Sequence, residues 1–105
     1  MKVIRQCEAN VELDGPEVVR TYLETGKITF GSSTLLPGQT GGIDPGHPQS
    51  HEVFFVSRGH VIMRNTNTMK CFELNEGDII LVEEGEPQIL EWVRQLLHGA
   101  VHQVI

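Results

Sequence analysis

The sequence predicts an all-β fold, either a barrel or a sandwich. Short segments rich in Val, Ile, Leu, Phe and Thr alternate along the chain with clusters of Gly, Pro and Asn. Many short strands separated by regular turn signals are typical of barrels and sandwiches. No repeat, low-complexity tract or linker interrupts the 105 residues, so we expect one domain over residues 1–105.

The apolar segments predict eight strands, at residues 3–8, 17–24, 28–36, 52–57, 60–65, 69–74, 78–83 and 87–93. The C-terminal stretch RQLLHGAVHQVI fits either a pair of strands broken at Gly99 or a short helix. Turns at Gly59, at 65–68 and at 75–78 predict a meander of antiparallel strands.

The segment from Pro37 to Ser50 is predicted to be an irregular loop. It contains four glycines and three prolines in fourteen residues. Long loops in compact domains tend to carry function. His47 therefore lies on a candidate functional loop, and Glu52 begins the strand that follows it.

The strand at 52–57 carries a hint of oligomerisation. If Glu52 faces inward, alternation turns Phe54 and Val56 inward, and Val53 and Phe55 outward. An outward apolar pair needs a cover, such as the N-terminal strand, the C-terminal segment or a second subunit. A homodimer is therefore expected.

Composition excludes several classes of function. The formal net charge of −6 argues against binding nucleic acid through its phosphates. Cys7 and Cys71 form no CxxC pair, and we expect both to be buried and reduced. No signal peptide or run of transmembrane length is present, so we expect a cytoplasmic protein without a membrane partner.

Two segments resemble the motifs of the cupin superfamily. The first motif has the form G-x5-H-x-H-x3,4-E-x6-G. In HPQSHEVFFVSRG, six residues separate Glu52 from Gly59, and four residues separate His47 from Glu52. The second motif, G-x5-P-x-G-x2-H-x3-N, resembles NEGDIILVEEGEPQIL, where Gly77 and Gly85 match its glycines.

The resemblance covers roughly residues 28 to 93. It implies a double-stranded β-helix, a jelly-roll-like barrel with a ligand or metal pocket in its mouth, and it adds to the expectation of a homodimer. The chain departs from the motifs at three positions. Pro45 stands where the first His belongs, Glu83 where the second motif has Pro, and Gln88 where it has His. Only His47 and Glu52 remain of the usual three-His, one-Glu ligand set.

A divalent metal (Mn, Fe, Ni or Zn) at this pocket needs more ligands than His47 and Glu52. Catalytic ions usually take three or four protein ligands. The amide oxygen of Gln88 is the best third candidate, and His51 the fourth, although strict alternation would turn His51 outward. The alternative is a metal-free barrel in which His47 and Glu52 bond to each other or to the loop backbone.

Other polar residues have two interpretations each. His98 and His102 would lie about 13 Å apart on a strand, too far for one ion, but about 6 Å apart on a helix. One turn carries three acidic residues, Glu83, Glu84 and Glu86. Glu83 is then either a general base at the barrel mouth or part of a solvated turn.

These observations support three hypotheses of function. The first is a metal-dependent enzyme of isomerase, lyase or dehydratase type acting on a small polar molecule, with His51 and Glu83 as acid/base groups. The second is a non-catalytic small-molecule-binding barrel that has lost the metal site. The third is an interaction protein whose partner covers Val53 and Phe55.

Overall fold

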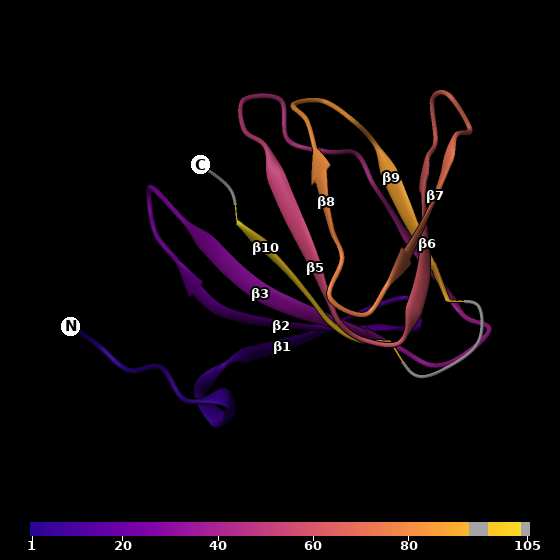
Figure 1. Ribbon diagram of the computed structural model, residues 1–105. Coiled ribbons are helices and arrows are strands. Elements are labelled where there is room, and N and C mark those ends of the chain that lie inside the picture. Colours follow the sequence, from indigo (N-terminus) through magenta and orange to yellow (C-terminus); the bar gives the residue numbers. More distant parts are fainter. Residues whose placement is uncertain (93–96, 104–105) are drawn as a thin grey trace.

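The structure is a computed structural model that describes residues 1–92 and 97–103, and within these it is built almost entirely of β-strands (Figure 1). A three-residue 3-10 helix, η1 (Gln6–Glu8), precedes the first strand. The strands are β1 (Asn10–Asp14), β2 (Glu17–Glu24), β3 (Thr29–Leu35), β4 (Thr40–Asp44), β5 (Glu52–Arg58), β6 (His60–Asn65), β7 (Cys71–Asn75), β8 (Ile79–Val82), β9 (Gln88–Trp92) and β10 (Leu97–Gln103). In this part of the chain no helix is long and apolar enough to cross a membrane.

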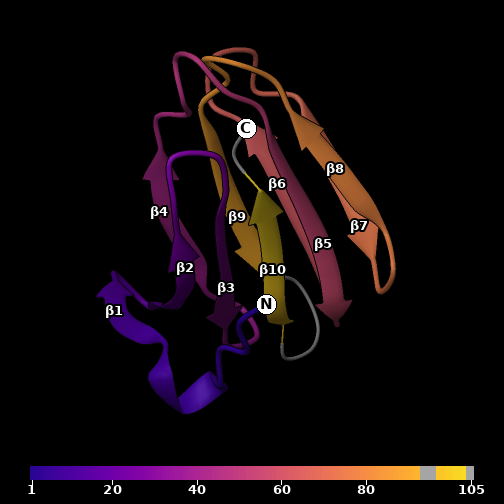
Figure 2. The same ribbon diagram turned by 90° about the vertical axis from the view of Figure 1, so that its left-hand side faces the viewer.

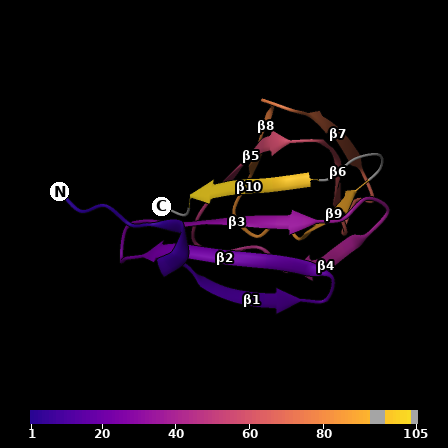
Figure 3. The same cartoon turned by 90° about the horizontal axis from the view of Figure 1, so that it is seen from below.

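The strands form two antiparallel sheets that face each other. The larger sheet has the order β1-β2-β3-β10-β5-β8, and the smaller has the order β4-β9-β6-β7. Strand β10 returns from the end of the chain to lie between β3 and β5, as Figures 2 and 3 show. This is the all-β, double-stranded β-helix that the sequence predicts, and the C-terminal stretch contributes a strand to it rather than a helix.

The predicted meander is wrong in its pairing. Strand β6 pairs with β7 as expected, but β5 pairs with β8 and β6 pairs with β9. Consecutive strands β5 and β6 therefore belong to different sheets. The buried Gly59, with φ +96°, makes the corner between them, because only glycine adopts this backbone without strain. The chain does turn at the predicted residues, but a turn signal alone does not distinguish a hairpin from a corner between sheets.

The prediction that 37–50 is wholly irregular is also wrong. Thr40–Asp44 forms β4, which pairs with β9. Glycine is unfavourable in a strand unless another group approaches closely. Both Gly41 and Gly42 are such cases: a Cβ on Gly41 would collide with Glu17 Oε1, and one on Gly42 would lie 2.9 Å from Asp14 Oδ1. These glycines are present because carboxylates approach the strand closely, and they do not mark a loop.

The N-terminal prediction fails as well. Residues 3–8 contain η1 and no strand, and the first strand is β1. Strand β1 does alternate, with Val11 and Leu13 between polar residues, so a strand pattern is present there although all five of its residues are exposed. The two cysteines are free, as expected, but exposed rather than buried, because Cys7 lies in η1 and Cys71 begins the edge strand β7.

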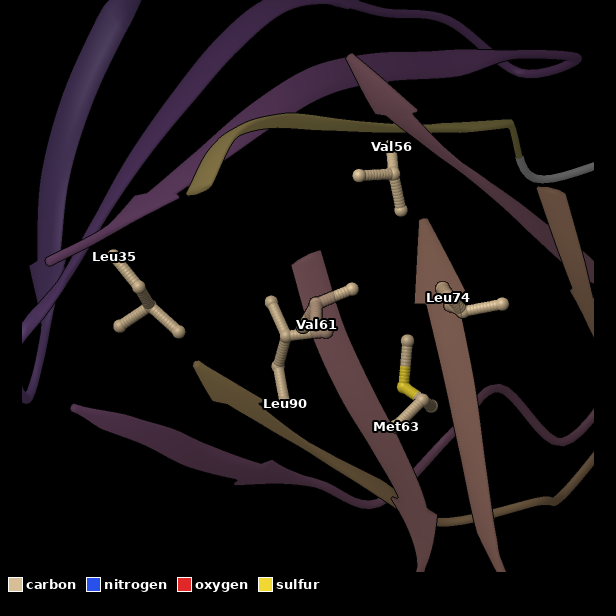
Figure 4. Packing of buried hydrophobic residues seen from close by; sticks show 6 residues of the cluster. All are labelled: Leu35, Val56, Val61, Met63, Leu74 and Leu90. Atoms are coloured by element: carbon tan, nitrogen blue, oxygen red, sulfur yellow. The ribbon is translucent and has the colours of Figure 1, made fainter. Parts of the chain in front are cut away.

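The core fills the space between the two sheets. Its buried members point toward one another from strands of both sheets in Figure 4: Leu35, Val56, Val61, Met63, Leu74 and Leu90. The alternation predicted for β5 is confirmed, since Glu52 and Val56 are buried while Phe55 is 41% exposed. Each core residue removes apolar surface from water, which is the main driving force for closing the two sheets.

Candidate functional site

The loop that carries His47 is docked onto the turn between β8 and β9. Gly46 has φ +83°, and a Cβ there would lie 2.5 Å from the Glu86 carbonyl oxygen. The Gly85 backbone N–H donates a hydrogen bond of 2.8 Å to the His47 carbonyl oxygen. A side chain at position 46 would be both strained and obstructed, so glycine there allows the two rims of the barrel mouth to meet.

Behind this rim, His47, Glu52 and Gln88 come together. Glu52 is the first residue of β5 and is 2% exposed, and Gln88 is the first residue of β9 and is 5% exposed. His47 Nε2 lies 3.2 Å from Glu52 Oε1. The Gln88 side chain also forms a hydrogen bond with the Glu52 carboxylate. Three residues chosen for their motif spacing therefore occupy one site.

Two oxygens of this site have no hydrogen-bond donor. Within the described residues, Glu52 Oε1 and Gln88 Oε1 are buried acceptors that receive no hydrogen bond, although His47 Nε2 lies 3.2 Å from Glu52 Oε1. A buried unpaired acceptor costs about 1–3 kcal/mol. Such oxygens beside an imidazole nitrogen suit either a cation or a ligand that brings its own N–H or O–H groups.

Asp44 is a member of this neighbourhood that the sequence interpretation missed. It pairs in register with Gln88 across β4 and β9 and accepts a hydrogen bond from the Gly46 N–H at 2.8 Å. Burial raises the pKa of Glu52, and the nearby Asp44 carboxylate raises it further, while His47 and the Gln88 hydrogen bond lower it. The feature of the sequence that could have indicated Asp44 is its position as a carboxylate three residues before His47, in the segment predicted to be a loop.

His51 lies elsewhere on the rim. Its side chain is 54% exposed, Nδ1 accepts a hydrogen bond of 3.2 Å from the Glu84 N–H, and Nε2 lies 3.9 Å from Glu84 Oε1. Strict alternation from Glu52 turns it outward, as expected. The structure thus brings His47, Glu52 and Gln88 together and leaves His51 on the outer side with Glu84. The side chains of His98 and His102 lie outside the described part of the structure.

A cavity of about 230 Å³ adjoins the three-residue site. Gln88 lines it together with Glu83 and Glu86 of the turn, and its apolar walls include Phe72 and Ile80. Ligand pockets of drug-sized molecules are about 300–1,000 Å³, so this one fits a smaller molecule. The candidate base Glu83 therefore faces the same cavity as Gln88.

A second cavity, of about 60 Å³, shares Gln88 and Met63 with the first. Asp14, Glu17 and Asp44 line it. Burial raises the pKa of Glu17, with smaller contributions from Asp14 and Asp44, whereas a hydrogen bond from Ser33 lowers it. The sequence interpretation placed Glu17 in a strand and gave it no role.

Glu17→Gln is expected to stabilise the protein at neutral pH. A carboxyl whose pKa is raised by folding favours the fold below its unfolded pKa, and this contribution is lost as pH rises through the folded pKa. The gain of Glu17→Gln over the parent should therefore be largest at pH 7 and shrink toward pH 4, as measured by urea unfolding. Glu24→Gln, an exposed change on the same strand, is the control. A Gln variant less stable than the parent at pH 7 would contradict this account.

Comparisons with solved structures place this architecture among cupins. No protein-family model matches the sequence, and no curated protein matches it significantly. A predicted oxalate decarboxylase from Thermotoga maritima superposes with a TM-score of 0.82 at 19% identity, over 99% of both chains. Fe(II) HppE gives 0.81 at 18% identity, over 99% of this chain and 60% of that one. The Cupin_2 domain of an XRE-family transcriptional regulator from Enterobacter cloacae gives 0.72 at 18%, over 85% and 96%.

The fold that the two motifs imply is thus confirmed: the chain has the fold of solved cupin domains. At these identities the likeness extends to the fold and not to the activity. The three proteins themselves span a predicted enzyme, an iron-containing protein and a regulator.

Proposed function

We propose that the protein is a metal-dependent enzyme of isomerase, lyase or dehydratase type that acts on a small polar molecule. The observation that carries the proposal is the pair of buried oxygens without donors, Glu52 Oε1 and Gln88 Oε1, beside His47 Nε2. One nitrogen and two oxygens match the mixed donor sets that bind Mn, Fe, Ni or Zn. When bound, such an ion polarises a carbonyl or carboxylate oxygen.

The chain's own groups supply the rest of the chemistry. His47, Glu52 and Gln88 would hold the ion, and the 230 Å³ cavity beside Gln88 would hold the substrate. Glu83 lines that cavity and serves as the group that accepts and returns a proton. His51 enters this proposal as a rim residue that fixes the turn through Glu84, rather than as a ligand.

A second candidate function is non-catalytic binding of a small molecule. The observation that favours it is that, among the described residues, no three His, Cys, Asp or Glu side chains are placed to hold one ion. The ligand's own N–H or O–H groups would then satisfy Glu52 Oε1 and Gln88 Oε1. The same cavity would hold the small molecule in both functions, and the metal content of the purified protein distinguishes the enzyme from the binding protein.

His47→Ala tests the first proposal. The parent, purified without a histidine tag, is expected to contain about one divalent ion per chain by elemental analysis, and its melting temperature should rise on adding Mn, Fe, Ni or Zn. His47→Ala should lose both properties. His51→Ala, which removes an exposed imidazole, should keep both. A parent without metal and without a thermal shift would overturn the metal-dependent enzyme.

We further propose that two copies form a homodimer through the outer face of β5 and β8. Val53 pairs with Leu81 and Phe55 with Ile79 across these strands, and Phe55, Ile79 and Leu81 are exposed. Since β8 is the edge of its sheet, an identical face of a second copy would cover this patch by two-fold symmetry. One domain over residues 1–105 and a cytoplasmic location, suited to two exposed free thiols, complete the proposal.

Phe55→Glu should convert the dimer to a monomer, because it places a charge at the centre of the covered face. Light scattering after size-exclusion chromatography would measure the mass. Ile43→Glu, at an exposed apolar position on the other sheet, should remain dimeric. A parent with the mass of one chain would contradict the dimer.

A further inference from the structure

The 60 Å³ cavity is built by the β1–β2 hairpin against β4. Asp14 ends β1 and Glu17 begins β2, so the tight turn between them places both carboxylates beside the glycine pair of β4. Gly41 and Gly42 leave open the space that these carboxylates use, since a Cβ on either would contact them. Ser33 of β3 donates a hydrogen bond to Glu17 Oε2 and holds it in place.

The charges around this cavity are of one sign. Three carboxylates line it, Asp14, Glu17 and Asp44, and none of its described lining residues is Lys or Arg. The Asp44 carboxylate raises the pKa of both Glu17 and Glu52, so it lies close enough to interact with each of them. Like charges in a partly buried site repel one another, and this arrangement costs stability unless a cation is present.

A second observation points independently to a ligand. Gln88 is 5% exposed and lines the cavity, and within the described residues its Oε1 accepts no hydrogen bond. The amide is already oriented by its hydrogen bond to Glu52, so this oxygen is held in place rather than free to turn to solvent. The cavity therefore presents three carboxylates and one fixed neutral acceptor, and its lining includes no cationic side chain.

The spacing of the acceptors selects the kind of donor. The described His, Cys, Asp and Glu side chains include no group of three close enough to hold a metal ion, although three carboxylates line this cavity. An ammonium group carries three N–H donors, and a guanidinium carries five in a planar fork, so either can reach acceptors too widely spaced for one ion. Phe54 adds an aromatic side chain to the wall, a type of group that attracts such cations.

We propose that this cavity binds the ammonium or guanidinium group of a small organic cation. A buried water needs about 10–15 Å³ of cavity volume, so a cavity of about 60 Å³ accommodates a head group of several atoms. Because Gln88 and Met63 line both cavities, the remainder of the molecule would extend toward the 230 Å³ cavity. The inference goes beyond the proposed enzyme function: Gln88 Oε1, which the metal proposal also uses, accepts from the cation where no metal is held, and Asp14 and Glu17 bind the cation in either case.

Titration with ethylguanidinium and ethylammonium chloride, followed by amide NMR at constant ionic strength, tests the proposal. Both cations should bind saturably and shift the amide signals of Ser33 and Gly42, whereas N-ethylurea, the neutral analogue of ethylguanidinium, should not. The stronger of the two identifies the preferred head group. Glu17→Gln should weaken binding at least about tenfold, as expected for loss of a charge-assisted hydrogen bond. Glu24→Gln, exposed on the same strand, should bind like the parent.

Two further variants distinguish a loss of cation binding from other effects of the substitutions. Gly41→Ala keeps every charge but displaces the Glu17 carboxylate, and it should weaken binding as well. His47→Ala should abolish metal binding while leaving cation binding intact, so failure of the metal proposal and failure of this one are distinguishable. Equal binding of N-ethylurea, no saturable binding of either cation, or an unchanged affinity in Glu17→Gln would overturn the proposal.

Discussion

Leu35→Ala is expected to lower the free energy of unfolding by about 2–5 kcal/mol, the usual range for such a change in a packed core. Leu35 ends β3 and is 0% exposed. Its side chain points into the interior between the sheets, toward Val61 and Leu90 (Figure 4). Truncation removes its transfer free energy and leaves a cavity that neighbouring strands of two different sheets cannot easily close.

The neighbouring residue provides a matched control. Leu36 is 57% exposed, and Leu36→Ala should change the free energy of unfolding by less than about 0.5 kcal/mol. Urea unfolding of both variants, followed by far-UV circular dichroism, would measure the difference. Similar losses in the two variants would mean that β3 does not present Leu35 to the core in the register described here.

Glu52→Gln is expected to weaken binding of a divalent ion by more than about 100-fold. Loss of a residue that only orients a metal ligand typically costs 10–100-fold, and a direct ligand should cost at least the upper end of that range. The substitution keeps the shape of the side chain and removes the charge. Because burial raises the pKa of Glu52, the neutral residue should not destabilise the metal-free protein.

Glu84→Gln is the control for this change. It makes the same chemical substitution at an exposed carboxylate that contacts His51 on the outer rim. Isothermal titration with Zn²⁺ or Mn²⁺ should give the parent affinity for Glu84→Gln and a large loss for Glu52→Gln. Equal affinities in the two variants would place the ion away from β5.

Much of the fold was accessible from the sequence because its strands alternate or carry apolar runs. β2, β5 and β6 follow that rule, and the motif spacing around Glu52 and Gly59 gave the architecture. β1 alternates apolar and polar residues over only five positions, none of them buried, and the glycine pair of β4 gives that strand the composition of a loop. The pairing of β5 with β8 depends on the closure of two sheets, which local turn signals do not encode.

The same distinction applies to the site. His47, Glu52 and Gln88 could be proposed together because the spacing of a known motif places them around one pocket. Asp14, Glu17 and Asp44 could not, because they belong to three strands that meet only when the β1–β2 hairpin packs on β4. The clue to their meeting, two consecutive glycines that yield space to carboxylates, becomes interpretable only in three dimensions.

The most direct test of the metal site is a crystal of the protein soaked in Mn²⁺ and measured for anomalous scattering. The account predicts one peak within about 2.0–2.3 Å of His47 Nε2 and of the Glu52 and Gln88 side-chain oxygens, the range for nitrogen and oxygen ligands. A peak bound by Glu83, Glu84 or Glu86 instead, or no peak in the barrel, would contradict it.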